Sequence, residues 1–328
     1  MSCLNRIDQS SLSILSLARE TKMNIKIIIR KIKTVLRNPQ SVAVKGLYKI
    51  SPLLNDENYL NLLFPLKTGY RLDLNSPKTF NEKLQWLKIN YRKPIMTQMV
   101  DKYESKNYVR NIIGDEYIIE NYGVWESFDE IKFDELPNQF VLKTTHDQGG
   151  VIIVRDKNKL DLKYAKSKLN THLKIQHYYL TREWPYKNVK PRIIAEKLLL
   201  SNLEPTSLID YKFLCFNGEP KVMYITHGDD KNKYYDYYDM NFEQLNIKRG
   251  SLASTDGVLK RPESWSLMLD ICRKLSKGFP HIRVDLYCLN GAVYFGELTF
   301  YQGGGMRVFH PREWDSILGE WINIDKYK

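Results

Sequence analysis

Two Asn-Gly dipeptides, each between apolar segments of strand length, constrain the fold of this chain more than any other feature. Both residues of such a pair tolerate positive φ, as the tight turn of a β-hairpin requires. The two dipeptides with their flanking segments are Leu208–Phe216, Asn217-Gly218 and Pro220–Thr226, and then Ile282–Leu289, Asn290-Gly291 and Ala292–Thr299. The C-terminal part of the chain is therefore predicted to contain two antiparallel hairpins.

The other segments predict helices packed on antiparallel strands. Apolar residues at helical spacing indicate helices, and short apolar or alternating runs indicate strands. Helices are expected over 76–112, capped by Thr79 or Asn81, and over 162–177 and 262–277; strands are expected over 117–120, 140–144, 151–155 and 192–200. Residues 38–70, which contain Pro39, Pro52 and Pro65, are expected to form loops with short helical pieces.

These elements predict an α+β protein with three regions. We expect a basic head over residues 1–44 that is peripheral or flexible, and a mainly helical subdomain over 45–136. Residues 137–328 contain the hairpins and form the predicted α+β core.

The net charge of +12 (50 basic and 38 acidic residues) raises nucleic acid, membrane surfaces and anionic substrates as partners. Half of it lies in residues 1–37, which hold eight basic and two acidic side chains. Within 24–37, isoleucines at helical spacing face away from Lys26, Arg30, Lys33 and Arg37. Such a helix can lie on the inner, anionic face of the cell membrane, or it can pack on the body of the protein. Met23 is an alternative start of the chain.

Composition excludes several classes of protein. Hydrophobic residues make up 43% of the chain, which is too many for a disordered protein, and no apolar run is long enough to span a bilayer. The polar start does not resemble a signal peptide, and the four cysteines are dispersed without a Cys-x-x-Cys pair. We therefore expect a cytoplasmic protein with reduced thiols, without a zinc site.

The last hairpin carries the clearest chemical pattern. Arg283 and Asp285 share one face of the first strand, and Glu297 and Thr299 share one face of the second. A regular register from the Asn-Gly turn places Asp285 opposite Gly296 and diagonal to Glu297. Two carboxylates and a further oxygen ligand suit Mg²⁺, and substrate phosphates can complete the coordination of the ion. The alternative is that these polar residues only face solvent.

Four further segments offer groups that can bind a nucleotide. Lys143 ends a strand, and Gly149 and Gly150 follow in a loop where backbone N–H groups can approach phosphate oxygens. The alternative there is an ordinary hairpin loop. Glu196 and Lys197 interrupt an apolar strand and either offer backbone groups to an adenine edge or mark a strand end. Lys212 lies on the first strand of the other hairpin, and Lys102 lies at the head of a helix.

In this order, these segments resemble the ATP-grasp superfamily, and within it the TupA-like (teichuronopeptide-biosynthesis) family of bacterial capsule and cell-wall polysaccharide gene clusters. The similarity covers about residues 45–325. The segments that carry it are Asn75–Trp86, Asp101–Tyr103, Phe140–Lys143, Glu196-Lys197, Asp210–Gly218, Arg283–Tyr287 and Phe295–Phe300.

The resemblance implies a fold and a set of ligand contacts. Two α+β subdomains would hold ATP between antiparallel sheets, with Mg²⁺ bridging its phosphates. Lys102, Lys143 and Lys212 would contact phosphates, and Gly149 and Gly150 would belong to a mobile loop over the triphosphate. The adenine would lie near Glu196 and Lys197.

The resemblance also implies the roles of the last hairpin. Asp285 and Glu297 would bind Mg²⁺ together with Thr299, which stands where ATP-grasp enzymes commonly have Asn. Arg283 would stabilise an acyl-phosphate. The loop 301–305, with Arg307 and His310, is a candidate for acceptor binding, or else a plain connection.

The predicted function is an ATP- and Mg²⁺-dependent, ADP-forming carboxylate–amine ligase. Its predicted substrates are an amino acid, peptide or other amine and a uronic acid of a capsule or cell-surface polysaccharide or its precursor. The alternative is a glycosyltransferase of capsule or O-antigen biosynthesis, although the chain lacks the Asp-x-Asp that such metal-dependent enzymes usually have. No nucleic-acid-binding motif accompanies the positive charge, so nucleic acid is not an expected partner.

Overall fold

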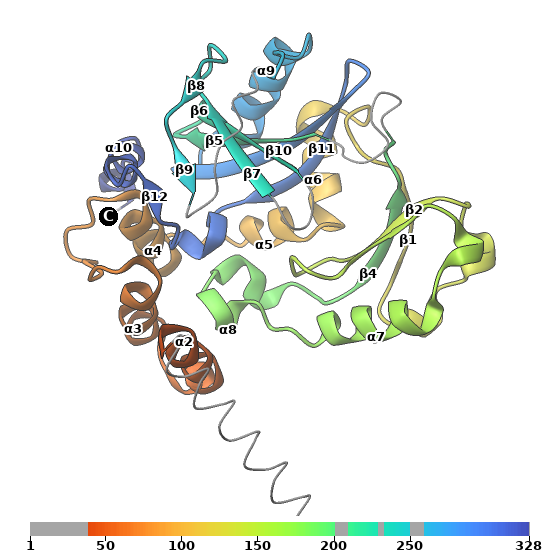
Figure 1. Ribbon diagram of the computed structural model, residues 1–328, viewed down its shortest axis with the longest axis horizontal. Helices are drawn as coiled ribbons and strands as arrows, with labels where there is room; N and C mark the ends of the chain where they lie inside the picture. Colours follow the sequence, from red (N-terminus) through yellow and green to blue (C-terminus); the bar gives the residue numbers. More distant parts are fainter. Residues whose placement is uncertain (1–38, 201–208, 229–232, 250–258, 328) are drawn as a thin grey trace, which may run out of the picture. The chain divides into compact units, whose positions relative to one another are not determined.

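The computed structural model describes residues 39–200, 209–228, 233–249 and 259–327 (Figure 1). The basic head with residues 24–37, and Met23, lie outside the described residues. The chain forms two compact units, residues 1–54 and residues 55–328. The predicted boundaries after residues 44 and 136 stay a prediction of domain organisation.

Residues 39–68 are almost entirely helical, so the prediction of loops with short helical pieces was wrong for this part of the chain. The first unit contains α2 (Pro39–Ile50) and the 3₁₀ helix η1 (Ser51–Leu53), and the second unit begins with α3 (Asp56–Thr68). The prolines do not prevent these helices: Pro52 lies in the first turn of η1, where its missing N–H costs no hydrogen bond, and Pro65 lies inside α3. Asn55 caps α3 by accepting a hydrogen bond from the N–H of Asn58 at 2.8 Å.

The predicted helical region 76–112 forms three helices. They are α4 (Phe80–Asn90), α5 (Ile95–Val100) and α6 (Glu104–Ile113). Thr79 begins α4 through a capping box with Glu82, in which each side chain accepts a bond from the other residue's backbone N–H. Of the two predicted caps, Thr79 and Asn81, the structure therefore has Thr79.

Both predicted hairpins are present in one antiparallel sheet of six strands, in the order β11-β10-β5-β6-β7-β8. Asn217, Gly218, Asn290 and Gly291 have the positive φ angles of 51°, 91°, 52° and 82° that the turns require. Helix α9 (Trp265–Ser276) packs against β5, β6 and β10. The strands are β5 (Asp210–Phe216), β6 (Glu219–Gly228), β7 (Lys233–Tyr238), β8 (Gln244–Leu245), β10 (His281–Leu289) and β11 (Ala292–Thr299).

A second antiparallel sheet has four strands in the order β1-β4-β2-β3, and α7 (Leu162–Leu173) packs against β2. The strands are β1 (Asn121–Trp125), β2 (Phe140–Thr144), β3 (Val151–Val154) and β4 (Ile193–Lys197). The strand predicted over 117–120 was misplaced. Ile118 closes a turn with the carbonyl of Asp115, and the carbonyl of Tyr117 binds Phe295 of the other sheet, so pairing with β4 starts only at Asn121.

The remaining described elements are short, apart from the C-terminal helix α10. They are η2 (Phe128–Glu130), η3 (Phe133–Glu135), η4 (Lys157–Lys159), α8 (Tyr178–Thr181), η5 (Trp184–Asn188), β9 (Lys248–Arg249), η6 (Gln302–Gly305), β12 (Phe309–His310), α10 (Glu313–Glu320) and η7 (Asp325–Tyr327).

Each large sheet contributes to its own hydrophobic core. The larger core joins the six-stranded sheet to α4, α5, α6, α9 and α10, through residues such as Phe80, Phe213 and Leu318. The smaller core joins the four-stranded sheet to α7, through residues such as Phe140 and Leu169. The α+β prediction is therefore confirmed.

Candidate active site

The hairpin β10–β11 contains a β-bulge that changes the predicted register. Leu289 pairs with Ala292 as expected, but a shift between Asp285 and Leu286 places Asp285 opposite Glu297 and not opposite Gly296. A bulge inserts one residue into one strand, which period-two counting cannot foresee. The backbones approach closely there, because a Cβ on Gly296 would lie 3.0 Å from the carbonyl oxygen of Asp285.

The corrected register brings five predicted site residues together. Arg283 binds both carboxylate oxygens of Asp285, with Nε–Oδ1 at 2.6 Å and Nη2–Oδ2 at 2.7 Å, and it also contacts Glu297. Lys212, which pairs with Asp285 across the strands, donates to Oδ2 at 2.7 Å. Thr299 pairs with Arg283 and donates its hydroxyl to Glu297 at 3.1 Å.

The charges in this cluster shift one another's titration. Burial alone would raise the pKa of Glu297, but Arg283 and Lys212 outweigh it and hold that pKa at about 2. Burial raises the pKa of Asp285 to about 6 against the opposing charges of the same two cations. The side chain of Glu297 is 37% exposed and that of Asp285 only 1%, so Glu297 is the carboxylate that an incoming ligand can reach.

The donor set fits a magnesium ion that shares its ligands with a substrate. Two carboxylates face each other on adjacent strands, and Mg²⁺ usually takes one or two carboxylates and completes its octahedron with phosphate and water. Among the described residues, no group of three His, Cys, Asp or Glu lies close enough to form an all-protein metal site. The hydroxyl of Thr299 donates to Glu297, which orients that carboxylate.

A second charged cluster lies in the four-stranded sheet. Glu196 on β4 forms ion pairs with Lys143 of β2 at 2.5 Å and with Lys106 of α6 at 2.7 Å. Burial would raise the pKa of Glu196, but Lys143 and Lys106 lower it to about 2. Sequence reasoning missed Lys106, and the available signal was its position four residues after Lys102 in one predicted helix.

Lys197 follows Glu196 on β4, but it is exposed whereas Glu196 is buried. Its side chain is exposed, with Nζ 3.9 Å from the carboxylate of Glu120. Its backbone N–H donates to the carbonyl of Glu120 at 3.0 Å, so this N–H, which an adenine contact could use, already has a partner within the protein.

The loop between β2 and β3 is held by a network that the sequence did not predict. The buried carboxylate of Asp147 accepts hydrogen bonds from Thr144 and from His172 of α7. Gly149 and Gly150 approach these partners, because a Cβ would lie 2.4 Å from the ring of His172 and 2.0 Å from the hydroxyl of Thr144, respectively. The adjacent His146 and Asp147 marked the loop as polar, but nothing in the sequence connected it to His172.

Lys102 lies within electrostatic reach of both clusters. Its Nζ donates to the carbonyl of Asp147 in the loop. Burial lowers its pKa, while Glu297 and Asp147 raise it and Lys143 lowers it further. Lys102 thus lies within electrostatic reach of Lys143 and Glu297, which belong to two different sheets (Figure 1).

Comparisons with known proteins bear on the family of this chain. The model of the family described as TupA-like ATPgrasp matches residues 82–323. A search of curated protein sequences finds no match. Similar solved structures include the D-alanine–D-alanine ligase of Bacillus anthracis complexed with ATP, at 15% identity and TM-score 0.42, covering 83% of this chain and 82% of that one.

Two further structures are similar at a comparable level. The D-alanine–D-alanine ligase of Helicobacter pylori has 13% identity and TM-score 0.39, covering 76% of this chain and 70% of that one. The N5-carboxyaminoimidazole synthase of Aspergillus clavatus, in complex with ADP and a ribonucleotide, has 12% identity and TM-score 0.36, covering 62% and 45%. Because the family match spans most of the sequence, this chain belongs to the TupA-like ATP-grasp family and is an ATP-dependent ligase, as the sequence predicted.

Proposed function

We propose that this protein is an ADP-forming carboxylate–amine ligase that joins an amino acid or short peptide to a uronic acid of a capsule or cell-surface polysaccharide, or of its precursor. The convergence of Arg283, Lys212, Asp285 and Glu297 on one face of the sheet carries this proposal. Activating a carboxylate with ATP brings two anions together, and this face combines cations with carboxylates that suit a metal.

Lysines of both charged clusters, together with Lys102, fit the triphosphate. In the proposal, Lys102, Lys143 and Lys212 contact phosphate oxygens, and Glu196 holds Lys143 in position through their ion pair. Gly149 and Gly150 allow the loop backbone to approach the triphosphate. The adenine lies at the end of β4, near Glu196 and Lys197.

The proposed reaction has two steps. A carboxylate oxygen of the acceptor attacks the γ-phosphorus of ATP, the bond from that phosphorus to the bridging oxygen breaks, and ADP leaves. The amine nitrogen then attacks the acyl carbon, and the carbon–oxygen bond to phosphate breaks with its electron pair on phosphate. The nitrogen loses a proton to water. Arg283 counters the negative charge of the acyl-phosphate in both steps.

Asp285 and Glu297 are the residues that would hold Mg²⁺, with Thr299 beside them. A bound Mg²⁺ would neutralise charge on the phosphate oxygens. The chain's own contribution is to place these two carboxylates on adjacent strands, and to leave Glu297 accessible while Asp285 is buried.

The proposed location is the cytoplasm, with contact to the inner face of the membrane through residues 24–37. This segment lies outside the described residues, and its basic charge is what supports the proposal. None of the helices in the described ranges has the length and apolar character needed to cross a bilayer. A peripheral contact would bring the enzyme close to lipid-linked saccharide precursors.

The proposal is tested with Asp285→Asn and Glu297→Gln. Both should abolish Mg²⁺-dependent ADP release, measured with a uronic acid and a panel of amino acids, while circular dichroism stays unchanged. Asp270→Asn is the matched control, because Asp270 is an exposed carboxylate paired only with surface Arg273. Unchanged ADP release in both site variants would refute the metal assignment. Sugar transfer from a nucleotide donor without ATP turnover would favour a glycosyltransferase.

A further inference from the structure

A pocket of about 210 Å³ lies in the second unit, beside the segment that follows β11. Its wall comes from the end of α3, the turn before α4, strand β12 and the first turn of α10. It is smaller than the roughly 300–1,000 Å³ of sites that enclose drug-sized ligands, so it suits one compact unit and not a nucleotide.

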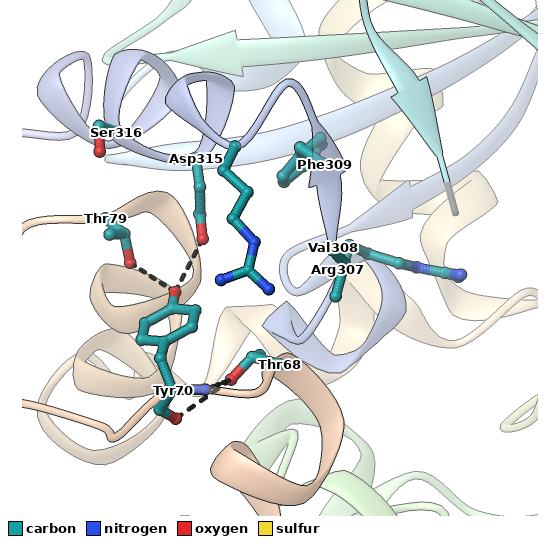
Figure 2. Close-up of a pocket in the computed structure, with 9 residues that line it drawn as sticks. Thr68, Tyr70, Thr79, Arg307, Val308, Phe309, Asp315 and Ser316 are labelled. Carbon is teal, nitrogen blue, oxygen red and sulfur yellow. Dashed lines mark hydrogen bonds between the residues drawn. The ribbon is translucent and has the colours of Figure 1, made fainter. Parts of the chain in front are cut away.

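The wall of this pocket is rich in hydroxyl groups. Thr68, Tyr70, Thr79 and Ser316 contribute them. Figure 2 shows the hydroxyl of Tyr70 between Thr79, at 2.9 Å, and the carboxylate of Asp315, at 2.7 Å. Hydroxyls both donate and accept, which is how proteins recognise other hydroxyl groups.

Asp315 has room for one more donor. Its carboxylate accepts from the backbone N–H of Asn81 at 2.9 Å, from the Asn81 amide at 2.8 Å and from Tyr70. A carboxylate offers about four lone-pair sites, so one remains for a ligand hydroxyl. The ring of Phe309 and the side chain of Val308 add apolar surface to the wall, against which the C–H face of a sugar ring can pack.

Arg312 supplies the positive charge of the pocket. Its guanidinium has no hydrogen-bond or ion-pair partner in the described part of the chain, and its Nη2 lies 3.9 Å from the place of a Cβ on Gly69. Arg307 also lines the pocket, but its side chain turns away from Tyr70 in Figure 2 and its Nε lies against Gly303. Arg312 is therefore the guanidinium that is free to meet an anion.

We propose that this pocket binds one anionic sugar unit, with Arg312 on its carboxylate or phosphate and with Asp315 and the neighbouring hydroxyls on its ring hydroxyls. The inference rests on the proposed function, because it makes the pocket a second contact for a saccharide acceptor, apart from the reacting carboxylate.

The test is titration calorimetry of the full chain, without ATP, with glucuronate, glucose 6-phosphate, glucose and acetate. Glucuronate or glucose 6-phosphate should bind more tightly than glucose and acetate. Whichever of these two sugars binds more tightly shows whether the pocket prefers a carboxylate or a phosphate. Arg312→Gln should weaken that binding about tenfold, as expected for loss of one charged hydrogen-bond pair, and Ser316→Ala should weaken it several-fold. Arg155→Gln, at an exposed arginine just after β3, should change nothing.

The proposal is overturned if acetate binds as tightly as the anionic sugars, because the pocket would then be a general anion site. It is overturned too if glucose binds as tightly as they do, because the pocket would then not recognise the negative charge of the ligand. It is also overturned if Arg312→Gln has no effect. Because this measurement needs no ATP, its failure leaves the ligase proposal standing. Conversely, ADP release that survives Asp285→Asn and Glu297→Gln refutes the metal assignment at the hairpin β10–β11 and has no bearing on the pocket.

Discussion

Glu196 illustrates how one buried carboxylate can organise two lysines. It lies on a central strand of the smaller sheet, where burial penalises a charge, and it is nevertheless held ionised by Lys143 and Lys106. Buried ion pairs contribute little net stability compared with apolar packing, but removing one partner is costly. The ion pair with Glu196 therefore fixes the position of Lys143, but it also makes the protein sensitive to substitution of Glu196.

Replacing Glu196 by Gln should destabilise the protein by about 3 kcal/mol, because the buried Lys106 loses its counter-charge. The KM for ATP should also rise, since Lys143 is no longer held in place. Urea unfolding and initial rates measure the two effects. Glu120→Gln is the control, because Glu120 forms only an exposed pair with Lys197 and should change stability by less than about 1 kcal/mol. Equal effects of both variants would contradict this account.

His281 should make the protein sensitive to acid. Its Nδ1 lies 3.0 Å from the carbonyl of Cys215 and its ring packs between Phe80 and Phe216, so burial lowers its pKa to about 3. The unfolded chain, with a pKa of about 6.5, binds a proton below that pH while the folded protein does not. Stability is therefore full above pH 6.5 and is lost as the pH falls.

The expected loss between pH 7 and pH 5 is about 2 kcal/mol from His281 alone. Urea unfolding at the two pH values should show a pH dependence smaller by that amount in His281→Gln than in the wild type. Identical pH dependence in the two proteins would show that the pKa of His281 is the same in the folded and unfolded chains.

At the scale of elements, helix α4 fixes the loop that follows β11. Asn81, Gln85 and Lys88 share one face of the helix, and each binds this segment. Lys88 is fully buried and donates to the carbonyls of Gly304, at 2.6 Å, and Thr181, at 2.7 Å. The φ angles of Gly303, Gly304 and Gly305 are 59°, 69° and 62°, a left-handed run that glycine alone adopts easily.

Lys88→Met should destabilise the protein by about 1–3 kcal/mol, because the carbonyls of Gly304 and Thr181 lose the hydrogen bonds that Lys88 donates. It should also raise the KM for the acceptor more than the KM for ATP, since the loop that Lys88 holds is the candidate for acceptor binding. Lys78→Met, at an exposed lysine just before the same helix, should leave both quantities unchanged. A uniform loss of activity with unchanged KM values would argue against a role for the loop in acceptor binding.

For the whole molecule, the main consequence of the fold is that two hydrophobic cores support two charged clusters. The larger core carries the hairpin with Asp285 and Glu297, and the smaller core carries Lys143 and Glu196. Lys102 interacts electrostatically with both clusters. A nucleotide bound by both clusters would therefore stabilise the unit as a whole.

A non-hydrolysable ATP analogue with Mg²⁺, at about 100 times its Kd, should stabilise the wild type by about 2.7 kcal/mol and raise the Tm by several degrees. Lys102→Met and Lys143→Met should each reduce this shift in Tm at the same analogue concentration. Lys166→Met, which breaks only an exposed pair with Asp129, should retain it. A full shift in the Lys102 and Lys143 variants would mean that neither lysine contacts the nucleotide.

The sequence by itself determined the two hairpins, the α+β class and most of the charged residues of the site, because Asn-Gly turns and apolar periodicity are local properties. It did not determine the register at Asp285, because a bulge depends on how the two strands pack. It also missed Lys106 and His172, whose partners Glu196 and Asp147 are distant along the chain. Only tertiary structure decides such contacts, because burial makes an ion pair or hydrogen bond necessary and sequence spacing does not show which groups become buried together.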